Sequence, residues 1–234
     1  MEKKITMNKK LIIITGASSG IGAALAKTFS IAGYSLGLIS RNLKAMEDLN
    51  LPETICQSVD VTDHASFKEA IKNAENKLGQ VDCLINNAGF LKYGSFNEIQ
   101  PEDHANMVNV NLLGVINGIE SVISGMQDRK SGTIINISSL ADRNSRPKFE
   151  TYAATKAAVK SLSESLRMAN AKNGIRICNI APANILTEMS VSAKLDPKLA
   201  VSADDFAKTV LWIYQQPQNI CIRDLVFSST YYEP

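Results

Sequence analysis

The most constraining feature of the sequence is a glycine-rich segment, residues 15–22 (TGASSGIG), that directly follows an apolar, β-branched run at 11–14. After it, apolar residues recur at helical spacing from 21 to 32, where Gly33 ends the pattern. A glycine turn between a strand and a helix lets backbone N–H groups and the helix N-terminus approach an anion closely. The segment therefore predicts a pyrophosphate site. It is not a P-loop, because no Gly-Lys-Ser/Thr follows the glycines.

The same alternation of apolar strands and amphipathic helices continues along the chain. We expect further strands at 34–39, 55–59, 81–85, 132–137, 175–180 and 220–227, and helices at 43–49, 67–78, 101–126, 152–173 and 202–214. Strands that are apolar throughout are covered on both faces, and the intervening helices supply that cover. The sequence therefore predicts an α/β fold of the Rossmann type, with a doubly wound, mostly parallel sheet of about seven strands and helices on both faces.

Length and composition favour one domain that binds small ligands. The 234 residues contain no repeats, low-complexity tracts or linkers, so we predict a single domain over 1–234. Residues 184–202 have no clear period and are a candidate lid over a substrate. With 25 Lys and Arg against 23 Asp and Glu, the net charge of +2 lacks the basic footprint of proteins that bind nucleic acids or membrane surfaces.

The cysteines and histidines give no sign of a metal site. The four cysteines are far apart and form no C-x-x-C pair, so we interpret them as buried free thiols in a reducing compartment. His64 and His104 have no partners at metal-ligand spacing and are interpreted as surface residues. Because no run approaches ~18 consecutive apolar residues, and the apolar run near the N-terminus is too short for a signal peptide, we expect a cytoplasmic protein.

The end of the expected second strand indicates which dinucleotide the glycine turn would bind. In such folds an acidic residue there binds the ribose of NAD, whereas a basic residue accommodates the 2′-phosphate of NADP. Here the strand leads into Ser40-Arg41-Asn42, and the next carboxylate is Glu47. We therefore predict NADP(H) rather than NAD(H), with Arg41 at the phosphate and Ser18 or Asn42 assisting. The alternative is that Arg41 is a solvated surface residue.

Tyr152 and Lys156 are candidates for acid/base chemistry. Their i, i+4 spacing on the expected helix at 152–173 puts a phenol and an ammonium on one helix face. Free tyrosine titrates near ~10, so acid/base work near neutral pH requires a lower pKa. A lysine charge or the positive charge of an oxidised nicotinamide would lower it. Such pairs are also common on solvated helix faces, so the spacing alone leaves that interpretation open.

Five ordered motifs together resemble the classical short-chain dehydrogenase/reductase family over nearly the whole chain. Residues 15–22 resemble its cofactor turn, Asp60-Val61 its adenine-flanking pair, and Asn86-Asn-Ala-Gly89 the motif that supports its central sheet. Asn111, Ser139, Tyr152 and Lys156 match its active-site residues. The resemblance implies an NADP(H)-dependent oxidoreductase that transfers hydride between the nicotinamide and a carbonyl or alcohol carbon of a small molecule.

The resemblance also implies roles for single residues. Ser139 would hydrogen-bond the substrate oxygen, Tyr152 would give or take the proton, and Lys156 would hold the cofactor ribose and lower the pKa of Tyr152. Asn111 would position a water that relays protons to Lys156. The near neighbours Ser138 and Asn109 are expected to face elsewhere. The expected cofactor-binding residues are Gly16, Ser18, Ser19, Gly20, Ile21, Gly22, Arg41, Asn42, Asp60, Val61, Asn87, Ala88, Gly89, Tyr152, Lys156, Pro182, Ile185 and Thr187.

Two segments depart from the family pattern. Pro182-Ala183 stands where the family usually has Pro-Gly, and alanine tolerates fewer backbone conformations than glycine. The loop at the nicotinamide end is therefore expected to be shaped differently. The C-terminal residues 224–234 also lack the glycine-rich stretch that often ends reductases of acyl chains carried by a protein.

Substrate and assembly are open at this stage. Substrate contacts are expected from 90–96, from 140–150 and from the candidate lid. Arg143, Arg146 and Lys148 in the second segment could favour an anionic substrate such as a carboxylate, or could be solvated loop charges. Apolar faces on the helices at 101–126 and 152–173 predict a homodimer or homotetramer, with core packing as their alternative use. The alternative functions are a reductase of 3-oxoacyl chains on a carrier, a dehydratase or epimerase, and a non-catalytic NADP-binding sensor.

Overall fold

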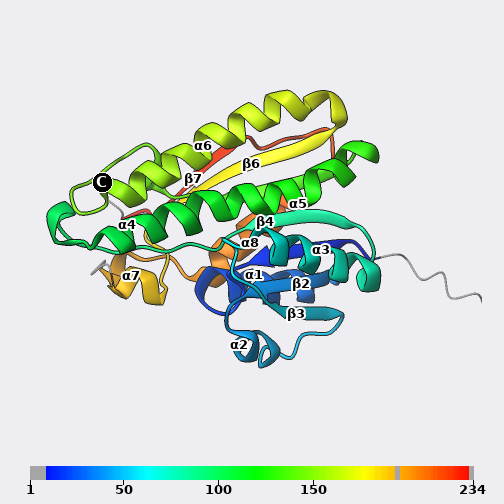
Figure 1. Ribbon diagram of the computed structural model, residues 1–234, viewed down its shortest axis with the longest axis horizontal. Coiled ribbons are helices and arrows are strands. Elements are labelled where there is room, and N and C mark those ends of the chain that lie inside the picture. Colours follow the sequence, from blue (N-terminus) through cyan, green and yellow to red (C-terminus); the bar gives the residue numbers. More distant parts are fainter. Residues whose placement is uncertain (1–8, 193–195, 232–234) are drawn as a thin grey trace, which may run out of the picture.

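A computed structural model describes residues 9–192 and 196–231, and the strands of this part of the chain form one seven-stranded sheet (Figure 1). The strands are β1 (Leu11–Thr15), β2 (Ser35–Ser40), β3 (Thr54–Ser58), β4 (Val81–Asn86), β5 (Gly132–Ile137), β6 (Ile175–Pro182) and β7 (Asp224–Phe227). Their order is β3-β2-β1-β4-β5-β6-β7, and every neighbouring pair is parallel. The predicted doubly wound fold is confirmed. Its order reverses between β1 and β4, where the carboxyl ends of the strands open a crevice.

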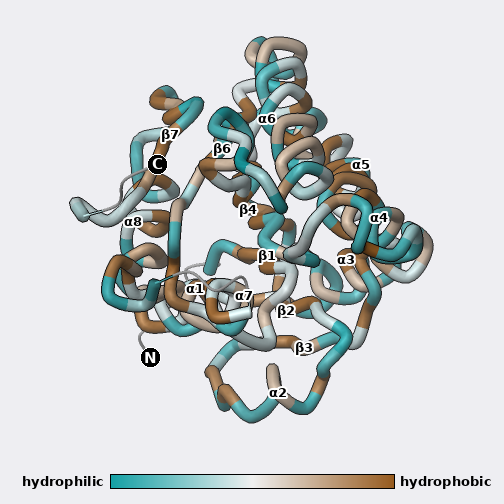
Figure 2. The backbone as a smooth tube through the Cα atoms, turned by 90° about the vertical axis from the view of Figure 1, so that its left-hand side faces the viewer, coloured by the Kyte–Doolittle hydropathy of each residue, from teal (hydrophilic) through white to brown (hydrophobic). Residues whose placement is uncertain are grey.

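Helices cover both faces of this sheet. One face packs against α1 (Gly20–Ile31) and α8 (Ala203–Gln215), and the other against α3 (His64–Leu78), α5 (Gly114–Asp128) and α6 (Glu150–Asn170). Within β1, Ile12 and Ile14 belong to the first core and Leu11 and Ile13 to the second, because successive side chains of a strand point to opposite faces. Figure 2 shows the resulting apolar stretches of β1 and β4 between the two helix layers.

The helix expected at 101–126 is interrupted. In the structure α4 (Pro101–Val108) is followed by a π-helical turn, Asn109–Leu113, before α5 begins. A π-turn accommodates extra backbone within a helix and often occurs at functional sites. Apolar periodicity does not signal it, because the apolar residues on either side still recur at helical spacing. The turn contains Asn111, whose side chain is fully buried and hydrogen-bonds the backbone of Phe90, just after β4.

The helical stretch Pro101–Asp128 is long and apolar enough to cross a membrane by those two measures. It packs against α3, α6 and β4, and 44% of its most apolar window is buried inside the protein. A core helix of this kind passes the same test, so the stretch is weak evidence for a membrane span.

The edge of the sheet differs most from the sequence-based expectation. β7 covers Asp224–Phe227 rather than 220–227, and its residues alternate between exposed and half-buried. Full cover on both faces therefore applies to the inner strands only.

Within the candidate lid, α7 (Glu188–Ser192) and a 3-10 turn, Pro197–Leu199, are joined to the fold by a bridge between Ile185 and Val201. Residues 193–195 of the expected lid lie outside the described residues.

We predict that Phe29→Ala lowers the free energy of unfolding by about 3–5 kcal/mol. Phe29 belongs to α1 and is fully buried, with its ring centroid 5.7 Å from that of Tyr34 and 5.6 Å from that of Tyr214. Ile31→Ala on the same helix is the matched control, because Ile31 is 87% exposed. Urea denaturation measures both variants. Equal decreases in the free energy of unfolding for the two variants would contradict the burial of Phe29 in the core.

Candidate functional site

A cavity of about 890 Å³ opens at the carboxyl edge of the sheet. Its lining includes residues at or just beyond the ends of six strands: Gly16 after β1, Arg41 after β2, Asp60 after β3, Asn87 after β4, Ser139 after β5 and Pro182 in β6. The parallel sheet thus gathers at one edge segments that are far apart in the sequence. The size is typical of a site for a cofactor or a small ligand.

The glycine turn forms one wall of the cavity, and its glycines are sterically required. Gly16 and Gly20 adopt φ values of +65° and +51°, in the left-handed region that favours glycine. A Cβ on Gly22 would collide with the carbonyl oxygen of Gly16, and a Cβ on Gly16 would lie 2.8 Å from the Cα of Ala88. Gly22 itself does not line the cavity. Its role is to let α1 pack closely under the turn.

The N-terminus of α1 is open to a ligand. Its N-cap residue, Ser19, makes no side-chain capping hydrogen bond, and the first turn contains no acidic residue. Both Ser19 and Gly20 line the cavity. Free N–H groups and the positive end of the helix dipole therefore face a space in which an anionic group would be stabilised.

Thr15, which sequence reasoning did not single out, holds the glycine turn against the end of β4. Its Oγ1 accepts hydrogen bonds from the backbone N–H groups of Asn87 and Ala88, each at 3.0 Å, and its carbonyl oxygen accepts one from Nδ2 of Asn87 at 3.0 Å. These bonds join the two strands that flank the crevice. The only sequence signal was the position of Thr15 at the start of the glycine turn.

Arg41 and Asn42 line the cavity after β2, as expected for residues near an adenosine ribose. The side chain of Asn42 accepts a hydrogen bond from the N–H of Ala45 and caps α2 (Leu43–Glu47), which fixes the loop. After the neighbouring strand β3, Oδ1 of Asp60 accepts hydrogen bonds from the N–H and the hydroxyl of Thr62 at 2.9 and 2.8 Å. These bonds, with the charge of Arg41, hold the pKa of Asp60 below its usual value.

Tyr152 and Lys156 extend from α6 into the same cavity, and Ser139 faces them from the end of β5. Tyr152 is 8% exposed and Lys156 is 4% exposed. The ammonium of Lys156 lies 5.6 Å from the centroid of the Tyr152 ring and donates a 2.9 Å hydrogen bond to the carbonyl oxygen of Ile137. The structure therefore brings together the three residues that sequence reasoning proposed for acid/base chemistry.

The electrostatics of this group differ from the sequence-based expectation. Burial raises the pKa of Tyr152 to about 12, and a hydrogen bond with Ser139 only partly offsets it. Burial also lowers the pKa of Lys156 to about 8. In the protein without a ligand, the pKa of Tyr152 therefore shifts in the direction opposite to the one expected from a neighbouring lysine. Desolvation is the largest cause for both groups, since it disfavours the charged form of each.

Asn111 lies behind the cavity wall rather than in it. Its Oδ1 accepts from the N–H of Phe90 at 2.7 Å, while its Nδ2 donates to the carbonyl of Phe90 at 2.9 Å and to Oγ1 of Thr155 at 3.1 Å. The amide thus ties the end of β4 to α6, one residue before Lys156. Asn109, expected to face elsewhere, does line the cavity, because the π-turn changes the directions of the residues within it.

Most of the predicted cofactor-binding residues share this one cavity. Those that line it are Gly16, Ser18, Ser19, Gly20, Ile21, Arg41, Asn42, Asp60, Val61, Asn87, Ala88, Gly89, Tyr152, Lys156, Pro182, Ile185 and Thr187. Sequence reasoning did not single out the lining residues Phe149, Glu188 and Met189. These residues belong to no motif, so only their positions in segments expected to contact substrate, 140–150 and 184–202, pointed to them.

Ala183 leaves the backbone less altered than expected. Its φ is not positive, and its N–H donates a 2.7 Å hydrogen bond to the carbonyl of Phe227 in β7. The left-handed conformation falls instead on Asn184, with φ of +45°. Asparagine tolerates that region better than most residues. The chain therefore turns into the 184–202 segment without a glycine.

The cations in the 140–150 segment do not line the cavity. The guanidinium of Arg143 turns away to Asp142 and Asp224, and Lys148 lies 5.7 Å from the ring centroid of Tyr93. Arg146 is likewise outside the cavity wall. The interpretation that Arg143 recognises an anionic substrate is therefore wrong, because two carboxylates already hold its charge.

The histidines are engaged in local contacts. Nδ1 of His104 lies 2.7 Å from the hydroxyl of Thr151, a contact that joins α4 to the start of α6. The imidazole also packs on the ring of Phe96. The imidazole of His64 lies 3.4 Å from the carboxylate of Glu120. The described residues contain no cluster of His, Cys, Asp or Glu that could hold a metal ion. All four cysteines are free, with Cys83 and Cys178 buried and the other two half-buried.

Solved structures with the same fold carry nicotinamide dinucleotides. An alcohol dehydrogenase from the archaeon Thermococcus sibiricus, complexed with 5-hydroxy-NADP, superposes with a TM-score of 0.88 at 25% identity and covers 97% of this chain and 99% of its own. The closed form of a serine dehydrogenase complexed with NADP+ gives a TM-score of 0.90 at 25% identity, covering 96% of each chain.

Sequence comparison agrees with the structural one. An uncharacterized oxidoreductase of Listeria monocytogenes is 33% identical over 244 aligned residues, which cover 97% of this chain and 98% of that protein. The family model for short chain dehydrogenases matches residues 10–198, from the start of β1 through most of the segment after β6. This range includes the glycine turn and the Ser139, Tyr152 and Lys156 group. The chain therefore belongs to the short-chain dehydrogenase/reductase family.

Proposed function

We propose that the protein is an NADP(H)-dependent oxidoreductase that transfers hydride between the nicotinamide and a carbonyl or alcohol carbon of a small molecule. One observation carries this proposal: Ser139, Tyr152 and Lys156 share a single cavity with the open helix N-terminus of the glycine turn. A dinucleotide bound across the crevice would reach from Arg41 to Tyr152, since both line that cavity. The related proteins solved with NADP+ or a derivative of it support the same cofactor.

The residues of the site fit such a cofactor. The backbone of the turn can approach a pyrophosphate because Gly16 and Gly20 carry no side chain into the cavity, and the first-turn amides of α1 have no competing cap. Lys156 offers a buried ammonium to a ribose hydroxyl. NADP(H), when bound, supplies or accepts the hydride.

The proton is handled by Tyr152 and Ser139. Because its pKa is about 12, the phenol of Tyr152 is protonated at neutral pH, which is the form that can donate a proton to the oxygen of a carbonyl as it is reduced. Ser139 would hydrogen-bond that oxygen as its negative charge grows. In the oxidation direction the phenol must first lose its proton, and the positive charge of an oxidised nicotinamide favours this loss.

The substrate we propose is neutral, with an apolar or aromatic substituent on the reacting carbon. Phe90, Leu91, Phe149 and Met189 line the cavity, together with the carboxylate-bearing Glu188. The ring of Phe149 packs edge-on against that of Tyr152, with centroids 6.2 Å apart. An apolar wall beside the phenol favours a flat apolar substituent on the substrate. The carboxylate of Glu188 would repel a substrate that carries a negative charge.

A homo-oligomer is the assembly that we propose. Val108, Leu113, Ile116 and Met168 are between 38% and 60% exposed on the helices α4 to α6 and the turn between them. Exposed apolar residues on neighbouring helices are typical of a contact between subunits.

Arg41→Asp is expected to change the cofactor preference. Replacing a cation at the 2′-phosphate position by a carboxylate should lower kcat/KM with NADPH by about 100-fold relative to NADH, equivalent to about 2.7 kcal/mol. Steady-state kinetics with both cofactors measure the ratio. Lys27→Asp, which makes the same charge change on the exposed side of α1, should leave it unaltered. An unchanged ratio in Arg41→Asp would overturn the assignment.

Tyr152→Phe is expected to reduce kcat by about 10²–10⁴-fold, the usual contribution of a positioned acid. The loss of one buried hydroxyl leaves the ring packing intact, so NADPH should still bind with little change in affinity. The turnover rate is measured by the loss of NADPH absorbance with a panel of carbonyl compounds in a stopped-flow instrument. The affinity for NADPH is measured by the fluorescence of the bound cofactor. Tyr34→Phe, outside the cavity, is the control. Turnover at the wild-type rate in Tyr152→Phe would refute the proposed chemistry.

Phe149→Ala is expected to raise KM for an aryl ketone by about tenfold, while a short aliphatic ketone changes little. Phe96→Ala serves as the control, because Phe96 is 59% exposed and does not line the cavity. In the wild type, an aryl ketone should be reduced faster than the same ketone carrying a ring carboxylate. Equal or better turnover of the carboxylated ketone would show that the neutral class is wrong.

A further inference from the structure

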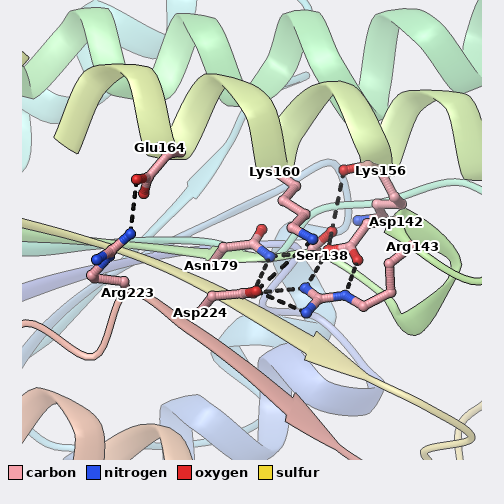
Figure 3. A network of polar contacts seen from close by, with 9 residues as sticks. All are labelled: Ser138, Asp142, Arg143, Lys156, Lys160, Glu164, Asn179, Arg223 and Asp224. Atoms are coloured by element: carbon pink, nitrogen blue, oxygen red, sulfur yellow. Dashed lines mark hydrogen bonds and ion pairs between the residues drawn. The ribbon is translucent and has the colours of Figure 1, made fainter. Parts of the chain in front are cut away.

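A buried carboxylate lies behind the catalytic group without being part of it. Asp142 ends the 3-10 turn Leu140–Asp142, three residues after Ser139, and its side chain is 0% exposed. Its carboxylate accepts hydrogen bonds from the hydroxyl of Ser138 at 2.9 Å, from Nδ2 of Asn179 at 2.9 Å and from Nε of Arg143 at 2.6 Å (Figure 3). A buried charge is tolerated only when it is paired and hydrogen-bonded, and here both conditions hold.

The carboxylate is the inner member of a charge network that ends at the sheet edge. The guanidinium of Arg143 bridges Asp142 to Asp224 in β7 through hydrogen bonds of 2.6 and 2.8 Å to the outer carboxylate. Asn179 in β6 donates to Asp224 as well as to Asp142, and Lys160 lies 3.9 Å from Asp224 (Figure 3). The network therefore joins the turn after β5 to β6 and β7.

Three of the elements around Asp142 carry charged groups, whereas β6 contributes the neutral amide of Asn179. α6 supplies the cations Lys156 and Lys160, the turn itself supplies Arg143, and β7 supplies Asp224. Farther along α6, the carboxylate of Glu164 is paired with Arg167 and with Arg223, at 2.8 and 3.0 Å. Of the three carboxylates, Asp142 is the one that is fully buried; Asp224 and Glu164 are partly exposed.

Two contacts link Asp142 to the catalytic residues. Its N–H donates to the carbonyl of Ser139, whose hydroxyl accepts from the N–H of Ala141, so the turn that buries Asp142 also orients Ser139. The hydroxyl of Ser138 lies 3.4 Å from the carbonyl oxygen of Lys156. In addition, the negative charge of Asp142 raises the pKa of Lys156, against the larger effect of burial, and also raises that of Tyr152.

We propose that Asp142 is a positioning residue: its hydrogen-bonded carboxylate fixes the turn that carries Ser139 and places a buried negative charge beside the segment of α6 that carries Tyr152 and Lys156. The proposal rests on the proposed oxidoreductase function. Burial alone disfavours the ammonium, and a second charge within the same low-dielectric region opposes that effect. Ser138, expected only to pack in the sheet, has a specific role in this arrangement, because it donates to the carboxylate.

Two substitutions change the electrostatic potential at Lys156 and Tyr152 in opposite directions. Asp142→Asn keeps the size of the side chain and removes its negative charge, so Lys156 and Tyr152 should both lose protons at lower pH. Arg143→Gln removes the cation that shields the carboxylate, so both should hold their protons to higher pH. We expect shifts of about one pH unit in each direction. Glu164→Gln makes the same charge change as Asp142→Asn on a distant turn of α6 and should shift neither group.

The first readout does not require turnover. Lysine labelled with ¹³C at Cε gives an NMR signal for Lys156, assigned with Lys156→Met, and its titration is followed in the wild type and the three variants. The second readout is the alkaline limb of kcat/KM for carbonyl reduction, which should move down in Asp142→Asn and up in Arg143→Gln. If Asp142→Asn does not fold, the upward shift in Arg143→Gln still tests the proposal.

Shifts of the same sign in both charge variants, or no shift in either, would overturn the role of Asp142. A structural role alone would lower stability and kcat without moving the titration of Lys156. If the wild type oxidises no NADPH with any carbonyl while the NMR titrations shift in opposite directions, the proposed function fails but the electrostatic coupling is confirmed.

Discussion

The chemistry of this site depends on the burial of one ammonium and one phenol at the carboxyl edge of a parallel sheet. Lys156 and Tyr152 are each less than 10% exposed, and desolvation moves the pKa of Lys156 down to about 8 and that of Tyr152 up to about 12. Both pKa values lie above neutral pH, so both groups hold their protons there. The buried ammonium is retained because the carbonyl of Ile137 accepts its hydrogen bond and because Asp142 opposes the desolvation.

The topology of the sheet places this pair where a dinucleotide could meet it. All neighbouring strands are parallel, and the order reverses between β1 and β4. The glycine turn after β1, Asn87 after β4 and α6 after β5 therefore face one cavity, although more than a hundred residues separate the first from the last. Thr15 and Asn111 stabilise the wall of this cavity, because each hydrogen-bonds backbone groups of the segment that follows β4.

The sequence predicted the parts of the structure that repeat or that obey local rules. The doubly wound, parallel sheet followed from the alternation of apolar runs and helices, and Gly16, Gly20 and Gly22 are where a tight turn needs them. The π-turn at Asn109–Leu113 was missed because apolar periodicity persists on both sides of it. In the protein without cofactor the pKa of Tyr152 is raised rather than lowered, since an i, i+4 lysine is visible in a sequence but the loss of water around both groups is not. The ion pair of Arg143 with Asp224 was not foreseen, because the two residues are distant in sequence and only the fold brings them together.

The ionisation of Tyr152 tests most directly whether burial sets its acidity, and it can be followed as the absorbance of ionised tyrosine in the wild type minus that of Tyr152→Phe. We predict that the phenol stays protonated well above pH 10 in the free protein, and that saturating NADP+ moves its titration to lower pH. A phenol that titrates near neutral pH without cofactor, or one whose titration does not respond to NADP+, would contradict the conclusion that burial sets its acidity and that the charge of the cofactor releases its proton.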